Sequence, residues 1–242
     1  MSAKWDAYYT TAEETGSPPP WESSEPFAPL QRIIEVLSLG HDMKVIELGS
    51  GASATACHLA ALGFAVTAVD ISGPALERAR RLPHAEKVNW VLCDILSPGD
   101  SSIADSTYEL LFDMQCFHVL REIDEKRAVE FIKDCLIPDR GVAVVVVGAS
   151  ISDDGEEEAA TGKPGPPRIK RKDFLRAFLG TELTVESCEL DAFNPTPSYG
   201  SSPPPCWVAV LKRRTMSKQM GINREDDEEK RQRLDIAQGL GC

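Results

Sequence analysis

The stretch that most constrains the fold is residues 44–54, where a short apolar run carrying one acid leads into a glycine-rich turn. It reads Lys-Val-Ile-Glu-Leu-Gly-Ser-Gly-Ala-Ser-Ala. Glycine suits a turn that needs a positive φ or a close approach of the backbone to a ligand. The helix expected after this turn presents free backbone N–H groups at its start. Because open α/β sheets hold nucleoside-bearing cofactors in this way, the stretch predicts a strand, a ligand-binding turn and a helix.

Strand and helix patterns alternate along the rest of the body, which predicts an α/β, Rossmann-like doubly wound fold. Strands are expected at 44–48, 64–69, 88–93, 108–113, 142–147, 182–190 and 206–212. Helices are expected at 29–39, 53–62, 72–82, 123–136 and 171–179. The unbroken apolar run at 142–147 is typical of a central parallel strand covered on both faces. With no helix between the last two strands, we expect a mostly parallel seven-stranded sheet with an antiparallel C-terminal edge hairpin.

The two ends of the chain differ from this body in composition. Residues 1–25 are rich in aromatic residues and proline, and Pro18 to Pro20 force an extended path before Trp21. This arm is either a flap that lays Trp21 over a cofactor or substrate, or a segment that buries its rings on the surface. Residues 26–212 form the expected domain, and 213–242 a charged tail outside its core. The acidic loop at 153–158 is either a lid or a solvated insertion.

Composition and charge exclude several kinds of partner. The net charge of −12 argues against binding to bare nucleic acid or to an anionic membrane. The sequence has no apolar run long enough to span a bilayer. Its seven cysteines form no Cys-x-x-Cys pair, and its four histidines show no zinc spacing, so no metal is expected. A monomeric cytoplasmic protein acting on a small molecule is expected.

Acids at the ends of the predicted strands indicate which cofactor the turn binds. Asp70, which ends the second strand, can accept hydrogen bonds from ribose hydroxyls, as both NAD and S-adenosylmethionine require. Glu47 separates these two cofactors, since a carboxylate just before the glycine turn would repel a pyrophosphate. It suits the ammonium and sulfonium cations of S-adenosylmethionine. Asp94 ends the third strand and can accept from an adenine amino group, and Asp113 ends the fourth at the same edge.

These residues resemble the motifs of a known family. The segment 45–51 is similar to the first motif of class I S-adenosylmethionine-dependent methyltransferases. Asp70, the segment 93–95 and the segment 108–113 fall where that family has its second, third and fourth motifs. The resemblance covers about residues 26–212 and implies S-adenosylmethionine as the cofactor. The cofactor-binding residues expected are Trp21, Glu47, Gly49, Ser50, Gly51, Asp70, Ile71, Asp94, Ile95 and Asp113.

A narrower resemblance concerns the acceptor. Trp5-Asp6, the Pro-Pro-Trp21-Glu22 stretch and residues 113–118 are similar to a small-molecule branch that includes thiopurine, thiol, halide and tellurite-resistance methyltransferases. In that branch the Pro-Pro-Trp segment covers the cofactor, which favours the flap interpretation of Trp21. The branch usually has Asp-Arg-Gly where this chain has Asp-Met-Gln at 113–115. The absent arginine counts against thiopurine-like or carboxylate acceptors.

The sequence therefore predicts methyl transfer to a small molecule, through a thiol or another soft nucleophile that needs no strong base. Residues expected at the acceptor are Tyr9, Cys116, Phe117 and His118. His118 is the only candidate general base, the alternative being a hydrogen-bonded structural histidine. Cys116 either lines the acceptor pocket or is a buried apolar residue. Methylation of a protein side chain or another metabolite, a non-catalytic cofactor-binding module, and NAD-dependent reduction remain as alternatives.

Overall fold

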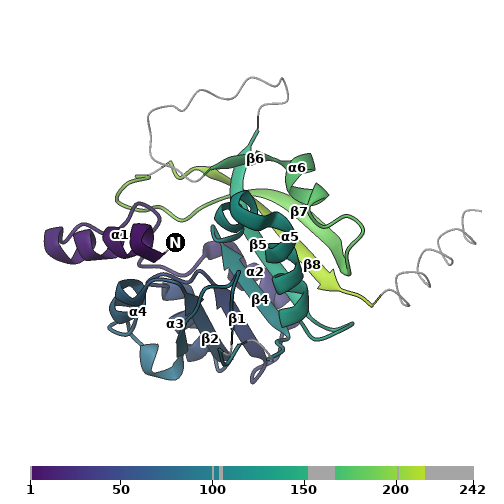
Figure 1. Ribbon diagram of the computed structural model, residues 1–242, viewed down its shortest axis with the longest axis horizontal. Coiled ribbons are helices and arrows are strands. Elements are labelled where there is room, and N and C mark those ends of the chain that lie inside the picture. The colour runs from purple at the N-terminus through teal and green to yellow at the C-terminus, as the bar shows by residue number, and fades with distance from the viewer. Residues whose placement is uncertain (1, 100, 104–105, 152–166, 201, 216–242) are drawn as a thin grey trace, which may run out of the picture.

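The computed structural model describes residues 2–99, 101–103, 106–151, 167–200 and 202–215. The acidic loop predicted at 153–158 lies outside these ranges, as does the tail from residue 216 onward. The described strands form one eight-stranded sheet in the order β3-β2-β1-β4-β5-β8-β7, with β6 paired to β5 (Figure 1). The strands are β1 (Lys44–Leu48), β2 (Ala65–Asp70), β3 (Asn89–Leu92), β4 (Leu110–Met114), β5 (Val142–Ser150), β6 (Arg168–Lys170), β7 (Leu183–Ala192) and β8 (Pro205–Arg213). The helices are α1 (Ser2–Thr15), α2 (Ala28–Val36), α3 (Ala54–Ala61), α4 (Gly73–Ala79), a 3-10 turn η1 (Ala85–Lys87), α5 (Phe117–Cys135) and α6 (Arg171–Arg176).

The topology confirms the predicted doubly wound fold. Strands β3, β2, β1, β4 and β5 run parallel, and β8 and β7 add an antiparallel hairpin at the edge. The seven predicted strands are all present. The eighth, β6, was not predicted because only three of its residues pair with the end of β5.

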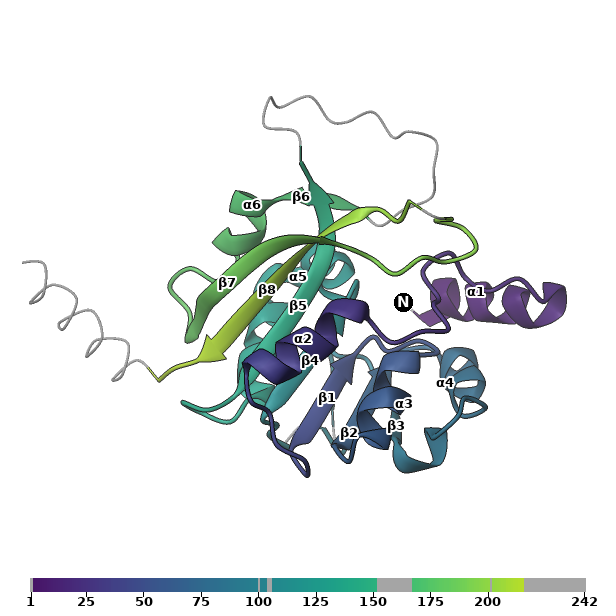
Figure 2. The same cartoon turned by 180° about the vertical axis from the view of Figure 1, so that it is seen from behind.

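Strand β5 lies at the centre of the core and is buried on both faces, as its apolar run predicts. Ala143, Val145 and Val147 pack with α5 and α6 on one face. The alternating residues Val142, Val144 and Val146 pack with α2 and α3 on the other. Figure 2 shows α2 and α3 in front of the sheet when it is seen from behind. This two-sided burial fixes the register of the strands.

Two serines begin the helices that follow β1 and β2. The Oγ of Ser53 accepts the N–H of Ala56, and the Oγ of Ser72 accepts the N–H of Ala75. Each cap satisfies a backbone donor that the first helical turn leaves free. Both helices therefore start at the carboxyl edge of the sheet, as the sequence predicts.

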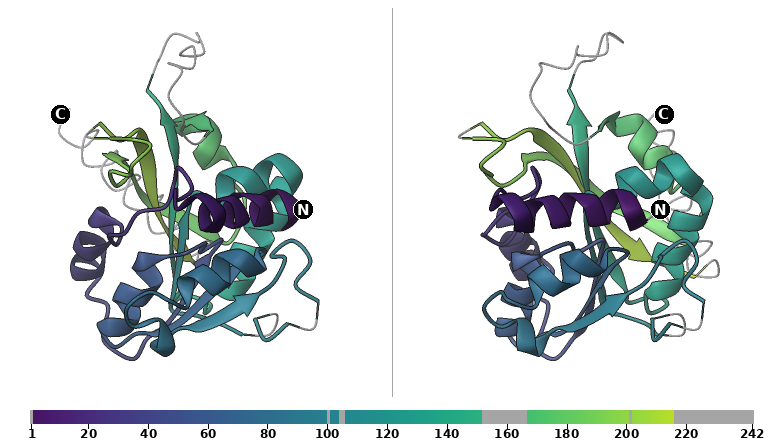
Figure 3. Two further views of the ribbon diagram at one scale, coloured as in Figure 1. Left: turned by 90° about the vertical axis from the view of Figure 1, so that its left-hand side faces the viewer. Right: turned by 60° about the vertical axis from the view of Figure 1, so that its left-hand side comes forward.

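The N-terminal arm begins with a helix that was not predicted from the sequence. Residues Ser2–Thr15 form helix α1, which crosses the end of the sheet above α3 and α4 (Figure 3). Only Tyr9 and Ala12 of this helix are buried, so its sequence carries little amphipathic signal. Arg78, at the end of α4, holds the arm by donating hydrogen bonds to Glu13 and to Glu22.

Helix α5 also begins earlier than predicted, at Phe117 rather than Ile123. Asp124 interrupts it with a non-helical φ of −156° and ψ of 87°. The carboxylate of Asp124 accepts the N–H of Arg127 and so caps the second part. The predicted start therefore corresponds to this interruption, and the first part of the helix was missed.

Candidate active site

The glycine turn between β1 and α3 is tightly packed against two other elements. Gly49 and Gly51 have φ values of +57° and +56°, which favour glycine. A Cβ atom at Gly49 would lie 2.5 Å from Sγ of Cys116, and one at Gly51 would lie 2.2 Å from the Tyr9 hydroxyl. Both the backbone conformation and the space therefore require glycine at these positions.

Asp70 ties the glycine turn to the end of β2. Its Oδ2 accepts the N–H of Gly51 at 2.7 Å, and its Oδ1 accepts the N–H of Ser72 at 2.8 Å. Burial raises the pKa of this carboxyl, and the two backbone donors oppose the rise. Each oxygen keeps a lone pair that can accept a further hydrogen bond from a ligand.

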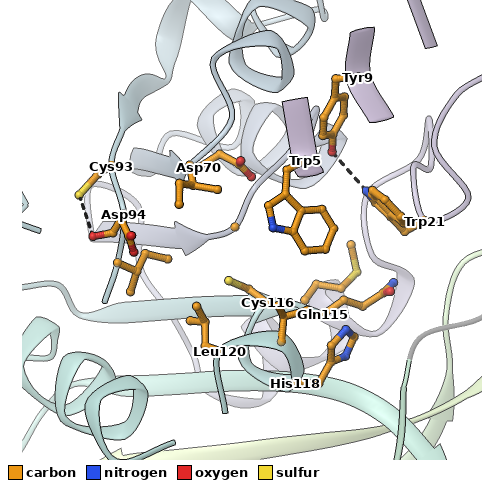
Figure 4. Close-up of a pocket in the computed structure, with 15 residues that line it drawn as sticks. Trp5, Tyr9, Trp21, Asp70, Cys93, Asp94, Gln115, Cys116, His118 and Leu120 are labelled. Atoms are coloured by element: carbon orange, nitrogen blue, oxygen red, sulfur yellow. Dashed lines mark hydrogen bonds between the residues drawn. The ribbon is translucent and has the colours of Figure 1, made fainter. Parts of the chain in front are cut away.

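A cavity, named here the main cavity, opens at the carboxyl edge of the sheet beside this turn. The residues that line it are Trp5, Tyr9, Trp21, Gly49, Asp70, Ile71, Cys93, Asp94, Ile95, Met114, Gln115, Cys116, His118, Val119 and Leu120. In the close-up, Cys93 and Asp94 lie at one end, and Trp21 and His118 lie at the other (Figure 4). The cavity thus joins a polar end at β2 and β3 to an aromatic and apolar end at the arm and α5.

A second hollow, named here the side cavity, shares with the main cavity a wall to which Tyr9, Trp21, Gly49, Met114 and Gln115 contribute. The remaining residues that line it are Glu22, Ser23, Glu25, Glu47, Ser50, Gly51, Ala52, Ser53 and Thr55. Three of these side chains are carboxylic acids, and no basic side chain lines it among the described residues. The side cavity therefore favours a positively charged group beside the glycine turn.

Three aromatic residues of the arm close over the turn. The indole N–H of Trp21 donates to the hydroxyl of Tyr9 at 3.2 Å (Figure 4). The ring of Trp21 packs edge-on against Trp5, with ring centres 5.6 Å apart. Because Tyr9 rests on Gly51 and Trp21 rests on Tyr9, the arm covers the boundary between the two cavities.

Glu47 is deeply buried and linked to the start of α3. The Ser53 hydroxyl lies 2.8 and 2.9 Å from its two carboxylate oxygens. Burial raises the pKa of Glu47 to about 8, and the Ser53 hydrogen bond opposes that rise. Without a ligand, Glu47 is therefore largely protonated at neutral pH. A bound cation would favour its ionised form.

Asp113 does not line either cavity. It is fully buried, and its Oδ1 accepts the N–H groups of Cys116 and Phe117, each at 3.1 Å. Burial raises its pKa to about 7. Its Oδ1 therefore holds the turn that begins α5, and its Oδ2 has no hydrogen-bond partner among the described residues.

The four residues that were predicted to contact the acceptor lie in different surroundings in the structure. Cys116 and His118 line the main cavity, whereas Phe117 is 0% exposed and stacks on Phe178 in the core. Successive residues point to different sides of the chain here. Tyr9 lies at the glycine turn between the cavities. Three of the four predicted residues, Tyr9, Cys116 and His118, therefore line the main cavity.

His118 is 6% exposed, and its Nδ1 has no hydrogen-bond partner among the described residues. Burial lowers its pKa to about 4, so the ring is neutral at physiological pH. Burial also raises the pKa of the Cys116 thiol well above its usual range. The aromatic end of the cavity therefore holds neither a strong base nor a thiolate.

Several residues of the main cavity were not predicted. They are Trp5, Cys93, Met114, Gln115, Val119 and Leu120. Trp5 was not predicted as a site residue, although it belongs to a stretch that resembles the small-molecule branch. Helix α1, which turns Trp5 toward the main cavity, was not expected. Cys93 directly precedes Asp94, and Met114 and Gln115 directly follow Asp113, so the available signals were adjacency to predicted site residues and the resemblance of segments 93–95 and 113–118 to family motifs.

The chemistry of the two cavities fits one kind of cofactor. A ligand with ribose hydroxyls for Asp70 and a cationic end for the acids of the side cavity would satisfy groups that the protein leaves partly unpaired. Among the described residues, Ser50 Oγ lines the side cavity and is buried without a partner. A pyrophosphate would instead lie beside the carboxyl groups of Glu25 and Glu47 and would gain no basic partner from the lining residues. In the described ranges, no cluster of three or more His, Cys, Asp or Glu side chains could hold a metal ion.

The fold and this carboxylate-lined glycine turn resemble those of class I S-adenosylmethionine-dependent methyltransferases. Residues 45–139, from β1 to the turn after α5, match the family model of the methyltransferase domain. The chain therefore contains a methyltransferase domain, and the predicted enzyme class and cofactor are confirmed. No curated protein sequence gives a significant match.

Solved structures with this fold include three informative relatives. One, described as "Conversion of a Disulfide Bond into a Thioacetal Group during Echinomycin Biosynthesis", has a TM-score of 0.70 and 21% identity, covering 94% of this chain and 99% of that one. A 1,6-didemethyltoxoflavin-N1-methyltransferase from Burkholderia thailandensis, with bound S-adenosylhomocysteine, has a TM-score of 0.61 and 17% identity, covering 88% and 87%. A TehB-like methyltransferase from Corynebacterium glutamicum has a TM-score of 0.54 and 17% identity, covering 88% and 97%. At these identities the likeness concerns the fold.

Proposed function

We propose that this enzyme methylates a small molecule on sulfur or another soft atom. The observation that carries the proposal is the buried setting of His118 and Cys116 in the main cavity, where the lowered pKa of the imidazole makes it a weak base. An oxygen or ammonium acceptor would need a base to remove its proton. A thiol ionises readily in water, and a soft nucleophile reacts without such help.

The residues that would hold S-adenosylmethionine follow from the two cavities. Asp70 would accept the ribose hydroxyls, and Asp94 with Ile71 and Ile95 would hold the adenine at the polar end of the main cavity. Glu47, Ser50 and the backbone of the glycine turn would hold the cationic methionyl end in the side cavity. This arrangement pairs the buried acid with positive charge.

The bound cofactor supplies a methyl group on a sulfonium. The protein's task is to position the acceptor in line with that methyl group and to exclude water. A thiol acceptor would lose its proton to solvent before it binds as the thiolate, and its sulfur–carbon bond would then form as the sulfonium–carbon bond breaks, leaving S-adenosylhomocysteine. Trp5 and Trp21 present aromatic rings at the boundary of the cavities, where they can stabilise a cation.

The arm is proposed to act as the cover of this site, with residues 1–25 over the catalytic domain at 26–212. Residues 213–242 are proposed to form a charged tail outside that domain. Within the described ranges, no helix combines the length and apolarity needed to cross a bilayer. We propose a cytoplasmic monomer as the working form.

Two relatives support different acceptors. The structure described for thioacetal formation concerns a sulfur-containing product, which agrees with a soft acceptor. The Burkholderia thailandensis enzyme is described as an N1-methyltransferase. A neutral nitrogen acceptor is therefore the second candidate here, because the unpartnered Nδ1 of His118 could accept its N–H.

Release of S-adenosylhomocysteine across thiols, halides, neutral nitrogen heterocycles, phenols and a basic protein mixture tests the proposal. We expect turnover with thiols, and we expect His118→Phe to keep most of it. A nitrogen acceptor should instead lose about 100-fold in that variant, the factor that a positioned base contributes. Turnover of the protein mixture alone would refute a small-molecule acceptor.

A further inference from the structure

The segment that joins β7 to β8 holds the N-terminal arm in place. We refer to its residues 193–200 as the hairpin connector. Phe193 and Tyr199 of the connector are buried in the same core cluster as Phe27. The connector is therefore a packed part of the fold, even though it links two strands at the edge of the sheet.

Asn194, at the start of the hairpin connector, is 8% exposed and makes four hydrogen bonds to residues 23–28, where the arm joins α2. Its Oδ1 accepts the N–H of Ala28 at 3.1 Å. Its Nδ2 donates to three oxygens, namely Ser23 Oγ at 3.2 Å, the Glu25 carbonyl at 3.0 Å and the Pro26 carbonyl at 2.8 Å. No other amino acid of this size offers both an acceptor and two donors in one plane.

Thr196 and Tyr199 extend these contacts toward the cavities. The Thr196 hydroxyl donates to the carbonyl of Pro20 at 2.8 Å and accepts the N–H of Tyr199 at 3.1 Å. The Tyr199 hydroxyl is hydrogen-bonded to Gln115, which lines both cavities. The hairpin connector thus contacts the backbone on both sides of Trp21 and also the wall of the main cavity.

We propose that Asn194 is a positioning residue that fixes Trp21 over the cofactor. The inference rests on the proposed role of Trp21 as the cover of the site. Backbone atoms before and after Trp21 are held by Thr196 and Asn194, so its ring is placed by the hairpin connector. Arg78 holds Glu22 from the opposite side and completes the attachment.

The rate at which S-adenosylhomocysteine dissociates, measured by stopped flow well below the melting temperature, tests this role. Asn194→Ala removes all four hydrogen bonds, and Asn194→Asp keeps the shape and the acceptor but loses the N–H donors. We expect both variants to release the product about tenfold faster, the factor that one or two lost hydrogen bonds contribute. Thr196→Val should shift the rate in the same direction by less, and it provides a milder variant.

Two controls separate positioning from general stability. Thr181→Val removes a hydroxyl that donates to the Phe178 carbonyl and accepts the N–H of Leu183, at the opposite end of β7 and away from the arm. It should release the product at the wild-type rate. In a Trp21→Ala background, Asn194→Ala should add no further acceleration, because the group that it positions is gone.

The results distinguish failure of the positioning role of Asn194 from failure of the proposed cofactor site. Wild-type release rates in both Asn194 variants and in Thr196→Val would overturn the positioning role alone. Equal acceleration in Thr181→Val, or full additivity with Trp21→Ala, would also overturn it. Failure of the wild-type protein to bind S-adenosylhomocysteine would remove the cofactor site and this inference with it.

Discussion

The buried carboxyl of Glu47 should make the stability of the cofactor-free protein depend on pH. Its pKa lies near its ordinary value of 4.5 in the unfolded chain and at about 8 in the folded one. Between these values the unfolded state has lost the proton that the folded state keeps. The free energy of unfolding therefore falls as pH rises, by about 1.4 kcal/mol per pH unit for this group.

Substitution of Glu47 by Gln removes this contribution while keeping the size and an oxygen that can accept from Ser53. Between pH 5.5 and 7.5 the wild-type protein should lose roughly 2 to 3 kcal/mol relative to Glu47→Gln. Asp113, whose pKa is also raised, contributes to both proteins. At pH 5.5 the two proteins should therefore be close in stability, and at pH 7.5 the variant should be the more stable one.

Urea denaturation of the cofactor-free proteins at the two pH values measures this difference. Glu77→Gln is the matched control, because Glu77 lies exposed on α4 and the chemical change is the same. Parallel loss of stability in wild type and Glu47→Gln would show that Glu47 is already ionised in the folded protein. That result would refute the inference that Glu47 stays neutral until a cationic ligand binds.

Three further predictions concern ligand binding. Calorimetry should show S-adenosylmethionine binding more tightly as pH rises from 6 to 8, by at most about tenfold per pH unit, since ionised Glu47 is the form that pairs with a cation. This pH dependence of the affinity should vanish in Glu47→Gln. An equal pH dependence in that variant would assign it to another group. Asp70→Ala should weaken binding by about 10- to 100-fold through lost hydrogen bonds to a charged acceptor, whereas unchanged affinity would mean that the ribose lies elsewhere. Deleting residues 1–25 should abolish turnover, and normal kinetics without the arm would reduce Trp21 to a packing residue.

The sequence predicts the sheet and its cofactor edge well because those signals are local. The local backbone structure follows directly from the apolar run of β5, from the glycines at 49 and 51 and from the serine caps. Strands that run parallel bring their carboxyl ends to one edge, so Glu47 and Asp70 could be placed together in advance. Asp113 follows the same pattern, yet its carboxylate turns to the start of α5.

Helix α1 and the anchoring role of Asn194 could not be predicted because they depend on contacts between distant parts of the chain. Helix α1 buries only two residues, and the prolines that follow it dominate any local interpretation of the segment. Trp5 reaches the main cavity only because α1 lies across the sheet. The role of Asn194 depends on partners more than 160 residues earlier, which no spacing pattern reveals.

The hydrogen bonds of Asn194 also determine the order in which the protein can become functional during its synthesis. The residues around Trp21 leave the ribosome long before Asn194, which lies 166 positions after its partner Ala28. Because a domain folds as a unit, Trp21 is fixed only once the hairpin connector has emerged. A chain truncated before β7 would thus contain the sequence of the glycine turn and still lack the anchor of its cover.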